Sequence, residues 1–137
     1  MADCLFCKIV KGEIPSEKIY EDKAAFAFLD IHPLAPGHTI VVPKVHAENI
    51  LDLPEMVVGP LFLGVRKVTA ALNLAIKPHG FTIGINHGKV SGQAIDHLHI
   101  HLIPRFEGDG GGSIHSVVKN QSSESVSAIK EKIIKFI

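Results

Sequence analysis

Imidazole and aliphatic side chains alternate without interruption in the stretch His97-Leu98-His99-Ile100-His101-Leu102-Ile103. Because successive side chains of a β-strand point to opposite faces, this stretch predicts a strand that ends at Pro104. Its aliphatic residues would anchor the strand on a core, and its three imidazoles would lie together on an exposed face. Serine, threonine, lysine or glutamate would serve equally well on a merely solvated face, so three histidines favour a site held on a rigid platform.

Two kinds of chemistry suit three imidazoles on one face. Neutral imidazole is a common metal ligand. It also attacks phosphorus and transfers protons, since an ordinary pKa of about 6.5 leaves it mostly neutral at pH 7. The segment just before the histidines, Asn86–Gln93, contains two glycines and two side-chain amides. Close backbone approach at the glycines, together with amide donors, predicts a phosphate cradle beside the histidines.

The rest of the chain supplies four more short strands and two helices. Apolar and β-branched runs predict strands at Lys18–Glu21, Ala24–Leu29, His38–Val42 and Phe81–Ile85. A long helix is predicted over Glu55–Ile76, where one apolar stripe recurs every three or four residues: Leu61, Val65, Val68, Leu72 and Ile76. A shorter amphipathic helix is predicted over Ser125–Phe136. Because the strands are grouped rather than alternated with helices, we expect an α+β fold. It is a single domain over residues 1–137, with a five-stranded antiparallel sheet, one long helix and a short C-terminal helix.

The composition argues against several classes of protein. The chain of 137 residues has 14 basic and 14 acidic residues and a formal net charge of zero, which argues against binding to nucleic acid. No apolar run approaches the length that spans a bilayer, and no basic and apolar leader precedes the domain, so we expect no membrane partner. The two cysteines are fewer than a secreted disulfide scaffold carries, which favours a cytoplasmic location.

These motifs resemble the histidine triad (HIT) family of nucleotide hydrolases and transferases. The resemblance rests on Gly92-Gln93 with the alternating histidines, and on Pro36-Gly37-His38 followed by Val42-Pro43-Lys44-Val45-His46. The N-terminal Cys4-Leu5-Phe6-Cys7-Lys8-Ile9, Gly12-Glu13-Ile14-Pro15 and Phe28-Leu29-Asp30-Ile31 match the usual opening of the family. The resemblance extends from Asp3 to Arg105. It implies a homodimer with one continuous antiparallel sheet and a nucleotide site on each subunit.

The resemblance also implies catalytic roles. His99 would attack the α-phosphorus and carry a covalent nucleotidyl intermediate, which water then releases as the monophosphate. His97 and His101 would flank the nucleophile, and His38 would lie close by. Gln93 would join these histidines in the catalytic set.

A nucleotide-binding set follows from the same resemblance. Gln93 and Asn86 would contact phosphate and sugar beside Gly92, His99 and His101, and Asp30 would hold the ribose hydroxyls. Six apolar residues would enclose the base of a purine nucleotide, although each of them alone is more typical of core packing: Leu5, Phe6, Ile9, Phe28, Leu29 and Ile31.

The spacing Cys4-x-x-Cys7 is half of a zinc site. By the resemblance, His46 and His97 would complete a structural zinc centre. The alternative is that the two cysteines simply pack near the terminus. A redox role would require a thioredoxin-like βαβ setting, which the predicted elements lack.

Two departures from the phosphoramidase branch leave the leaving group open. Ala94 stands where that branch usually has a serine, and the chain has no tryptophan. The ending Ile103-Pro104-Arg105 is closer to bacterial and archaeal members and to the dinucleoside-polyphosphate branch. We therefore expect an enzyme acting at the α-phosphorus of nucleoside phosphoramidates or related nucleotides. The alternatives are a dinucleoside polyphosphate hydrolase, a low-turnover nucleotide-binding regulatory protein and a small zinc-binding interaction module.

Assembly is predicted from apolar residues that do not fit the core stripe of the long helix. Leu63 and Leu74 are out of phase with that stripe, so they need another surface to cover them. Because most homo-oligomers are two-fold dimers, we expect a homodimer with Phe81–Ile85 or the long helix near its axis.

Overall fold

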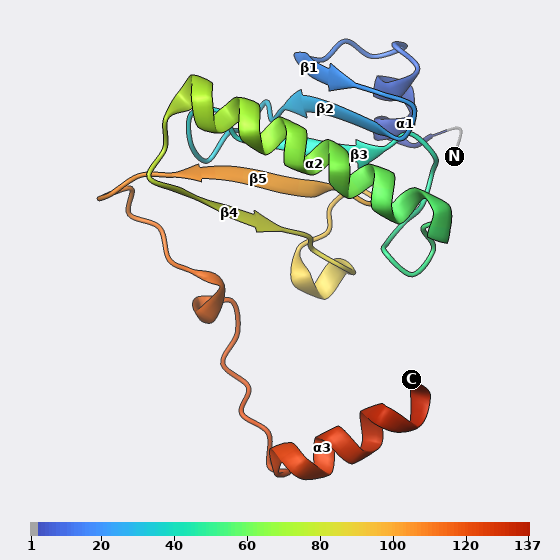
Figure 1. Ribbon diagram of the computed structural model, residues 1–137, viewed down its shortest axis with the longest axis vertical. Coiled ribbons are helices and arrows are strands. Elements are labelled where there is room, and N and C mark those ends of the chain that lie inside the picture. Colours follow the sequence, from blue (N-terminus) through green and yellow to red (C-terminus); the bar gives the residue numbers. More distant parts are fainter. Residues whose placement is uncertain (1–2) are drawn as a thin grey trace.

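The computed structural model describes residues 3–137, so residues 1 and 2 of the predicted domain lie outside it. Its centre is an antiparallel sheet with the strand order β1-β2-β3-β5-β4, crossed on one face by a long helix (Figure 1). The strands are β1 (Lys18–Glu21), β2 (Ala25–Leu29), β3 (Thr39–Pro43), β4 (Gly80–Gly84) and β5 (Ile100–Arg105). The predicted α+β class and five-stranded antiparallel sheet are confirmed.

The long helix, α2 (Glu55–Ile76), has the predicted bounds and covers one face of the sheet. Its buried stripe packs against the aliphatic residues of β5 and the alanines of β2. A Cβ added at Gly64 would lie 2.8 Å from the Cβ of Ala25, so glycine lets the helix approach β2 closely. By length and composition α2 is apolar enough to cross a membrane, contrary to our expectation that no run has that length. The stripe buried on the sheet accounts for this composition as that of a core helix.

A short helix, α1 (Leu5–Val10), was not predicted from the sequence. Phe6 and Ile9 of α1 pack with the residues of β2 and β3 that alternate with the α2-facing ones: Phe26, Phe28, Ile40 and Val42. The helix therefore covers the sheet face opposite to α2. Its first turn is capped by Cys4, whose Sγ accepts a hydrogen bond from the amide of Cys7 at 3.4 Å. Cysteine is not among the usual capping residues, which explains why α1 was not predicted.

Two strands include a proline. β3 ends at Pro43, one residue beyond the predicted bound, and β5 continues through Pro104, where we expected it to end. Pro43 of β3 pairs with Ala25, and Pro104 of β5 pairs with Phe81. The pairing between β3 and β5 runs only from Thr39 opposite Leu102 to Val41 opposite Ile100. Both prolines lie beyond this central ladder, where the missing amide costs no hydrogen bond to the other central strand.

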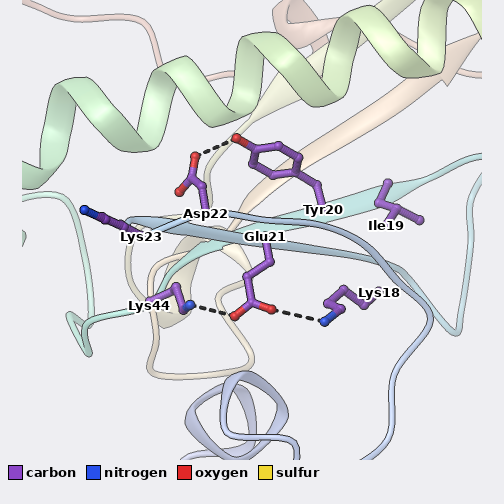
Figure 2. Close-up of a pocket in the computed structure, with 7 residues that line it drawn as sticks. All are labelled: Lys18, Ile19, Tyr20, Glu21, Asp22, Lys23 and Lys44. Atoms are coloured by element: carbon purple, nitrogen blue, oxygen red, sulfur yellow. Dashed lines mark hydrogen bonds and ion pairs between the residues drawn. The ribbon is translucent and has the colours of Figure 1, made fainter.

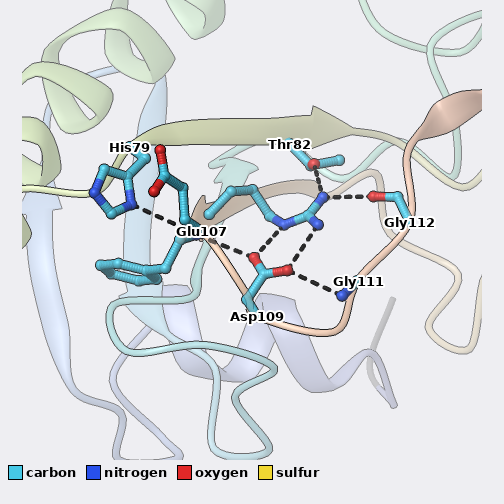
Figure 3. Close-up of polar contacts among 8 residues, drawn as sticks. His79, Thr82, Glu107, Asp109, Gly111 and Gly112 are labelled. Atoms are coloured by element: carbon cyan, nitrogen blue, oxygen red, sulfur yellow. Dashed lines mark hydrogen bonds and ion pairs between the residues drawn. The ribbon is translucent and has the colours of Figure 1, made fainter.

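A polar turn ends β5 and directs the C-terminal segment away from the sheet (Figure 3). Arg105 donates from Nε and Nη2 to the two carboxylate oxygens of Asp109, at 2.7 and 3.0 Å, and from Nη1 to Thr82 Oγ1 and Gly112 O. The guanidinium and two backbone amides hold the pKa of Asp109 far below its usual range. Beyond this turn lies α3 (Val126–Ile133), followed by a 3-10 turn (Ile134–Phe136), which together confirm the predicted terminal helix.

Candidate active site and metal centre

The three alternating histidines lie on the α1 side of the sheet, and Leu98, Ile100 and Leu102 lie in the core beneath α2. The predicted alternation is thus confirmed, although β5 begins only at Ile100. The expectation of an exposed histidine face is wrong. His97 is 0% exposed and His99 is 6% exposed, because α1 covers them and the Phe6 ring packs edge-on against both imidazoles.

His99 is held in one tautomer by the backbone. Its Nδ1 lies 2.7 Å from the main-chain oxygen of His97. A carbonyl oxygen only accepts hydrogen bonds, so Nδ1 carries a proton. In the neutral imidazole this bond selects the Nδ1–H tautomer and leaves the Nε2 lone pair free, as nucleophilic attack requires.

A second chain of hydrogen bonds fixes the proton of His101. The amide of Leu34 donates to Nδ1 of His38 at 3.1 Å, so His38 is protonated at Nε2. That nitrogen donates to Nδ1 of His101 at 2.9 Å, which leaves the proton of His101 on Nε2. We call these two imidazoles the His38–His101 relay. His101 is thereby set as a donor beside the lone pair of His99, whose ring centroid lies 5.2 Å from its own.

The relay is electrically neutral at pH 7. Burial lowers the pKa of His38 and of His101 below the ordinary value, and neighbouring histidines lower that of His101 further. Asp30 raises both pKa values in part, since its Oδ2 lies 3.6 Å from Nε2 of His38. The predicted ribose-binding carboxylate therefore adjoins the relay.

Gln93 has a different position from the one expected of a free phosphate donor. Its Oε1 accepts from the amide of Gly88 at 2.8 Å, and its Nε2 donates to the main-chain oxygens of Glu48 and Ile95 at 2.6 and 3.1 Å. The side chain is buried and its polar atoms are all paired with the backbone. Gln93 thus pins the loop before the histidines, and contact with a phosphate would require one of these bonds to break.

The same loop brings Asn86 and Gly92 together. Gly92 has φ +102°, and a Cβ there would lie 3.5 Å from Nδ2 of Asn86. Glycine allows this left-handed conformation without strain, so the loop closes tightly after the short 3-10 helix Lys89–Ser91.

The six residues expected around the base do not lie together. Phe6, Ile9 and Phe28 are buried in the core beneath α1. Leu5 and Ile31 are 38% and 80% exposed. Leu29 lines a hollow of about 390 Å³ together with Pro33, Ala35, Pro36, Gly37 and the two site residues Asp30 and His38.

A wider hollow of about 680 Å³ lies along β1 and contains none of the histidines (Figure 2). Most of its charged groups have partners: Glu21 accepts from Lys18 at 3.1 Å and from Lys44 at 2.6 Å. The Tyr20 hydroxyl donates to Asp22 at 2.6 Å. The histidine cluster is therefore the better candidate for a chemical site.

The predicted metal ligands meet at the N-terminus of α1. The ligand atoms of Cys4, Cys7, His46 and His97 all lie within 4.8 Å of one another. Nδ1 of His97 lies 3.4 Å from Cys4 Sγ and 3.5 Å from Cys7 Sγ, and Nδ1 of His46 lies 3.3 Å from Cys7 Sγ. Zinc bonds of about 2.3 Å to sulfur and about 2.05 Å to nitrogen place these atoms about 3.6 Å apart in a tetrahedron. The observed spacing thus fits a four-coordinate Cys₂His₂ centre.

A backbone oxygen orients the metal-facing nitrogen of His97. Nε2 of His97 donates to the main-chain oxygen of Pro43 at 2.9 Å, which leaves the Nδ1 lone pair directed at the thiols. Burial is the main cause that lowers the pKa of His97, so the ring is neutral, as a ligand must be.

Main-chain groups that organise the site were not predicted from the sequence. They are the oxygens of His97 and Pro43 and the amide of Leu34. Each belongs to a residue whose type carries no signal for that task, so only the folded geometry identifies them.

Known proteins resemble this chain along most of its length. A sequence model of the HIT domain matches residues 11–108. An uncharacterized HIT-like protein of Methanocaldococcus jannaschii is 43% identical over 123 residues, which cover 90% of this chain and 95% of the relative. An adenosine 5'-monophosphoramidase of Saccharomyces cerevisiae is 39% identical over 110 residues, or 80% of this chain and 67% of the relative. An adenylylsulfatase of Arabidopsis thaliana is 40% identical over 107 residues, or 78% and 54% of the two chains.

Two crystal structures share the fold. A member of the HIT family from Bacillus subtilis has a TM-score of 0.88 at 37% identity and covers 98% of this chain and 97% of its own. A Zn-bound histidine triad family protein from Mycobacterium smegmatis has a TM-score of 0.74 at 32% identity, covering 90% and 85%. The triad geometry, the domain match and these likenesses show that the chain belongs to the HIT domain family.

Proposed function

We propose that the protein is a nucleotide hydrolase or transferase that acts at the α-phosphorus through His99. The observation that carries the proposal is the hydrogen bond from Nδ1 of His99 to the backbone, which leaves Nε2 as a free nucleophile. Nε2 forms a bond to phosphorus while the bond from phosphorus to the leaving amine breaks. His101 Nε2–H is positioned to donate to a phosphoryl oxygen or to the leaving group. Water then attacks phosphorus, breaks its bond to His99 and releases the nucleoside monophosphate.

We propose a purine nucleoside phosphoramidate as the substrate class. The yeast and Arabidopsis relatives are named for two adenosine nucleotides with different leaving groups, which supports the nucleotide more than the leaving group. Asp30 borders the relay and the 390 Å³ hollow, where its carboxylate would bind the ribose hydroxyls. Apolar residues on both sides, Leu29 and the exposed Ile31, would then contact the base.

A hydrolysis panel tests this function. Adenosine and guanosine phosphoramidates and dinucleoside polyphosphates are assayed with the wild type and with His99→Ala. We expect phosphoramidate turnover that falls by at least about 10³-fold in His99→Ala, because the nucleophile is lost. His115→Ala removes an exposed histidine of the C-terminal segment and is the matched control, with unchanged turnover expected. Faster turnover of dinucleoside polyphosphates would redirect the proposal to that class, and normal turnover in His99→Ala would overturn the mechanism.

We propose that Cys4, Cys7, His46 and His97 hold a structural zinc ion. The donor set and its spacing fit such a centre, and one solved relative is described as Zn-bound. When bound, the ion would contribute folding free energy by joining α1 to the rest of the domain. Elemental analysis of freshly purified protein should give about one zinc per chain. Cys4→Ser should lower both the zinc content and the melting temperature, whereas metal-free protein with unchanged stability would contradict the site.

We also propose a homodimer in a reducing cytoplasm. β4 is an edge of the described sheet. Its Ile83 is 45% exposed, and Phe62 of α2, which lines the same hollow, is 39% exposed. Two copies paired along β4 would continue the sheet and cover these side chains. Leu63 and Leu74 are also exposed, but by helical spacing they point away from the core stripe, so they are less suited to this contact. Both cysteines are free thiols in the structure, which fits a reducing compartment.

A further inference from the structure

One residue belongs to both the metal centre and the nucleophile. The side-chain Nδ1 of His97 faces the two thiols, and its main-chain oxygen accepts the Nδ1 proton of His99. We propose that His97 is a positioning residue through which the metal centre holds His99 in its nucleophilic tautomer. The role of His99 as a nucleophile rests on the proposed function, whereas the coupling concerns only the tautomer and position of its ring.

The His97 backbone is fixed from two sides. The amide of Leu98 donates to the main-chain oxygen of Ala47 at 2.6 Å, next to the ligand His46, and Nε2 of His97 donates to the oxygen of Pro43. The segment 43–47 therefore holds His97 by its ring and by the following peptide, and it carries a ligand itself. A metal bound to His46 and His97 would lock these two segments together and so fix the carbonyl that His99 requires.

A packing contact supplies a second path. Phe6 lies between Cys4 and Cys7 in the sequence, and its ring meets His97 at 6.0 Å and His99 at 5.1 Å between centroids. The helix α1 has only six residues, and a helix this short is not stable in water without tertiary anchors. Its thiols are such anchors. When they lose their ligand, the phenyl ring that restrains the His99 ring is loosened together with His97.

Release of the metal should therefore affect His99 before it affects the α2 side of the sheet. Two hydrogen bonds still hold His97 after metal release, but the ion no longer joins it to His46 and the thiols. The His97 carbonyl should then be held less tightly, and both neutral tautomers of His99 should become populated. Only the Nδ1–H form presents Nε2 to phosphorus, so the competent fraction should fall by about 2- to 10-fold, in proportion to the population lost. A purely structural metal would instead lower the melting temperature and leave the tautomer of the folded state unchanged.

Imidazole ¹⁵N spectra of histidine-labelled protein without substrate measure this tautomer directly. The zinc-loaded wild type should show His99 as a single Nδ1–H form, assigned by its absence in His99→Gln. Cys4→Ser/Cys7→Ser should show both forms. Val68→Ala is the matched control, since it removes methyl groups from the α2 side of the core, destabilises the domain and leaves the metal ligands intact. We expect Val68→Ala to keep the single form.

Replacement of zinc by cadmium in the wild type provides a second test if the double variant does not fold. The larger ion should shift the His99 ring resonances and leave those of the exposed His115 unchanged. A single Nδ1–H form in folded, metal-free protein, or His99 resonances that do not respond to the ion, would overturn the coupling. Zinc-free wild-type protein would overturn it as well. Because no substrate is present, a protein without hydrolase activity still gives a result, so the two proposals fail separately.

Discussion

Removal of the donor in the His38–His101 relay should lower the catalytic efficiency of the protein. His38 is buried, and its Nε2 is 2.9 Å from Nδ1 of His101. His38→Leu leaves that acceptor without a donor, and we expect the free energy of unfolding to fall by about 1–3 kcal/mol. His101 recovers part of this loss when its proton moves to Nδ1, because the carboxylate of Asp30 lies nearby. Its Nε2 then accepts rather than donates, and the loss of this acid should lower kcat/KM by about 10²–10⁴-fold.

His38→Gln is the matched control, because the amide nitrogen of glutamine occupies nearly the place of Nε2 and can donate to His101. We expect His38→Gln to keep most of the phosphoramidase activity that His38→Leu loses. Steady-state kinetics give kcat/KM, and denaturant unfolding gives the free energy for each variant. Equal kcat/KM in the two variants would show that the donor does not set the proton of His101, and the relay would be refuted.

Three further predictions concern stability and assembly. Gly64→Ala should lower the free energy of unfolding by about 1–3 kcal/mol, because its Cβ would meet β2 at 2.8 Å. Gly59→Ala in the same helix has open space around its Cβ and should raise that free energy by up to about 1 kcal/mol. Equal effects of the two changes in denaturant unfolding would contradict the close packing. The free energy of unfolding should fall as pH drops below about 6.5. The cause is that histidines of the unfolded chain then bind protons, whereas His38 and His101 in the folded chain, with their lowered pKa values, stay neutral. A pH series of unfolding curves with no decline above the folded-state pKa values would be inconsistent with neutral, buried imidazoles. Phe62→Glu and Ile83→Glu should convert a dimer into monomers in light scattering, and dimers that survive both changes would exclude the β4 edge as the contact.

The parts of the fold with a strong period were predictable from sequence. The apolar stripe of α2 recurs from Leu61 to Ile76, and the bounds of this 22-residue helix were predicted correctly. The alternation from His97 to Leu102 assigned each side chain to the correct face. The order of strands, with β5 between β3 and β4, depends on long-range pairing that no local pattern contains.

The missed features are short or made by the backbone. α1 spans six residues and is capped by a thiol, so neither its length nor its cap is a usual signal. Because α1 was not predicted, we expected the histidine face to be exposed to solvent. In the structure, Phe6 of α1 covers His97 and His99. The residue types correctly indicated that the three histidines share one face of the sheet and that Cys4, Cys7, His46 and His97 cluster. They did not indicate that the side-chain amide of Gln93 is hydrogen-bonded to the backbone, because such pairing depends on the folded loop.

The covalent intermediate on His99 is the most direct test of the proposed mechanism. Purified protein is mixed with an adenosine phosphoramidate, quenched within the first turnovers and measured by intact-protein and peptide mass spectrometry. We predict an adenylyl group on the peptide that contains His99, present in the wild type and absent in His99→Ala. Turnover of the phosphoramidate with no adduct at any time, or an adduct that persists in His99→Ala, would contradict the assignment of His99 as the nucleophile.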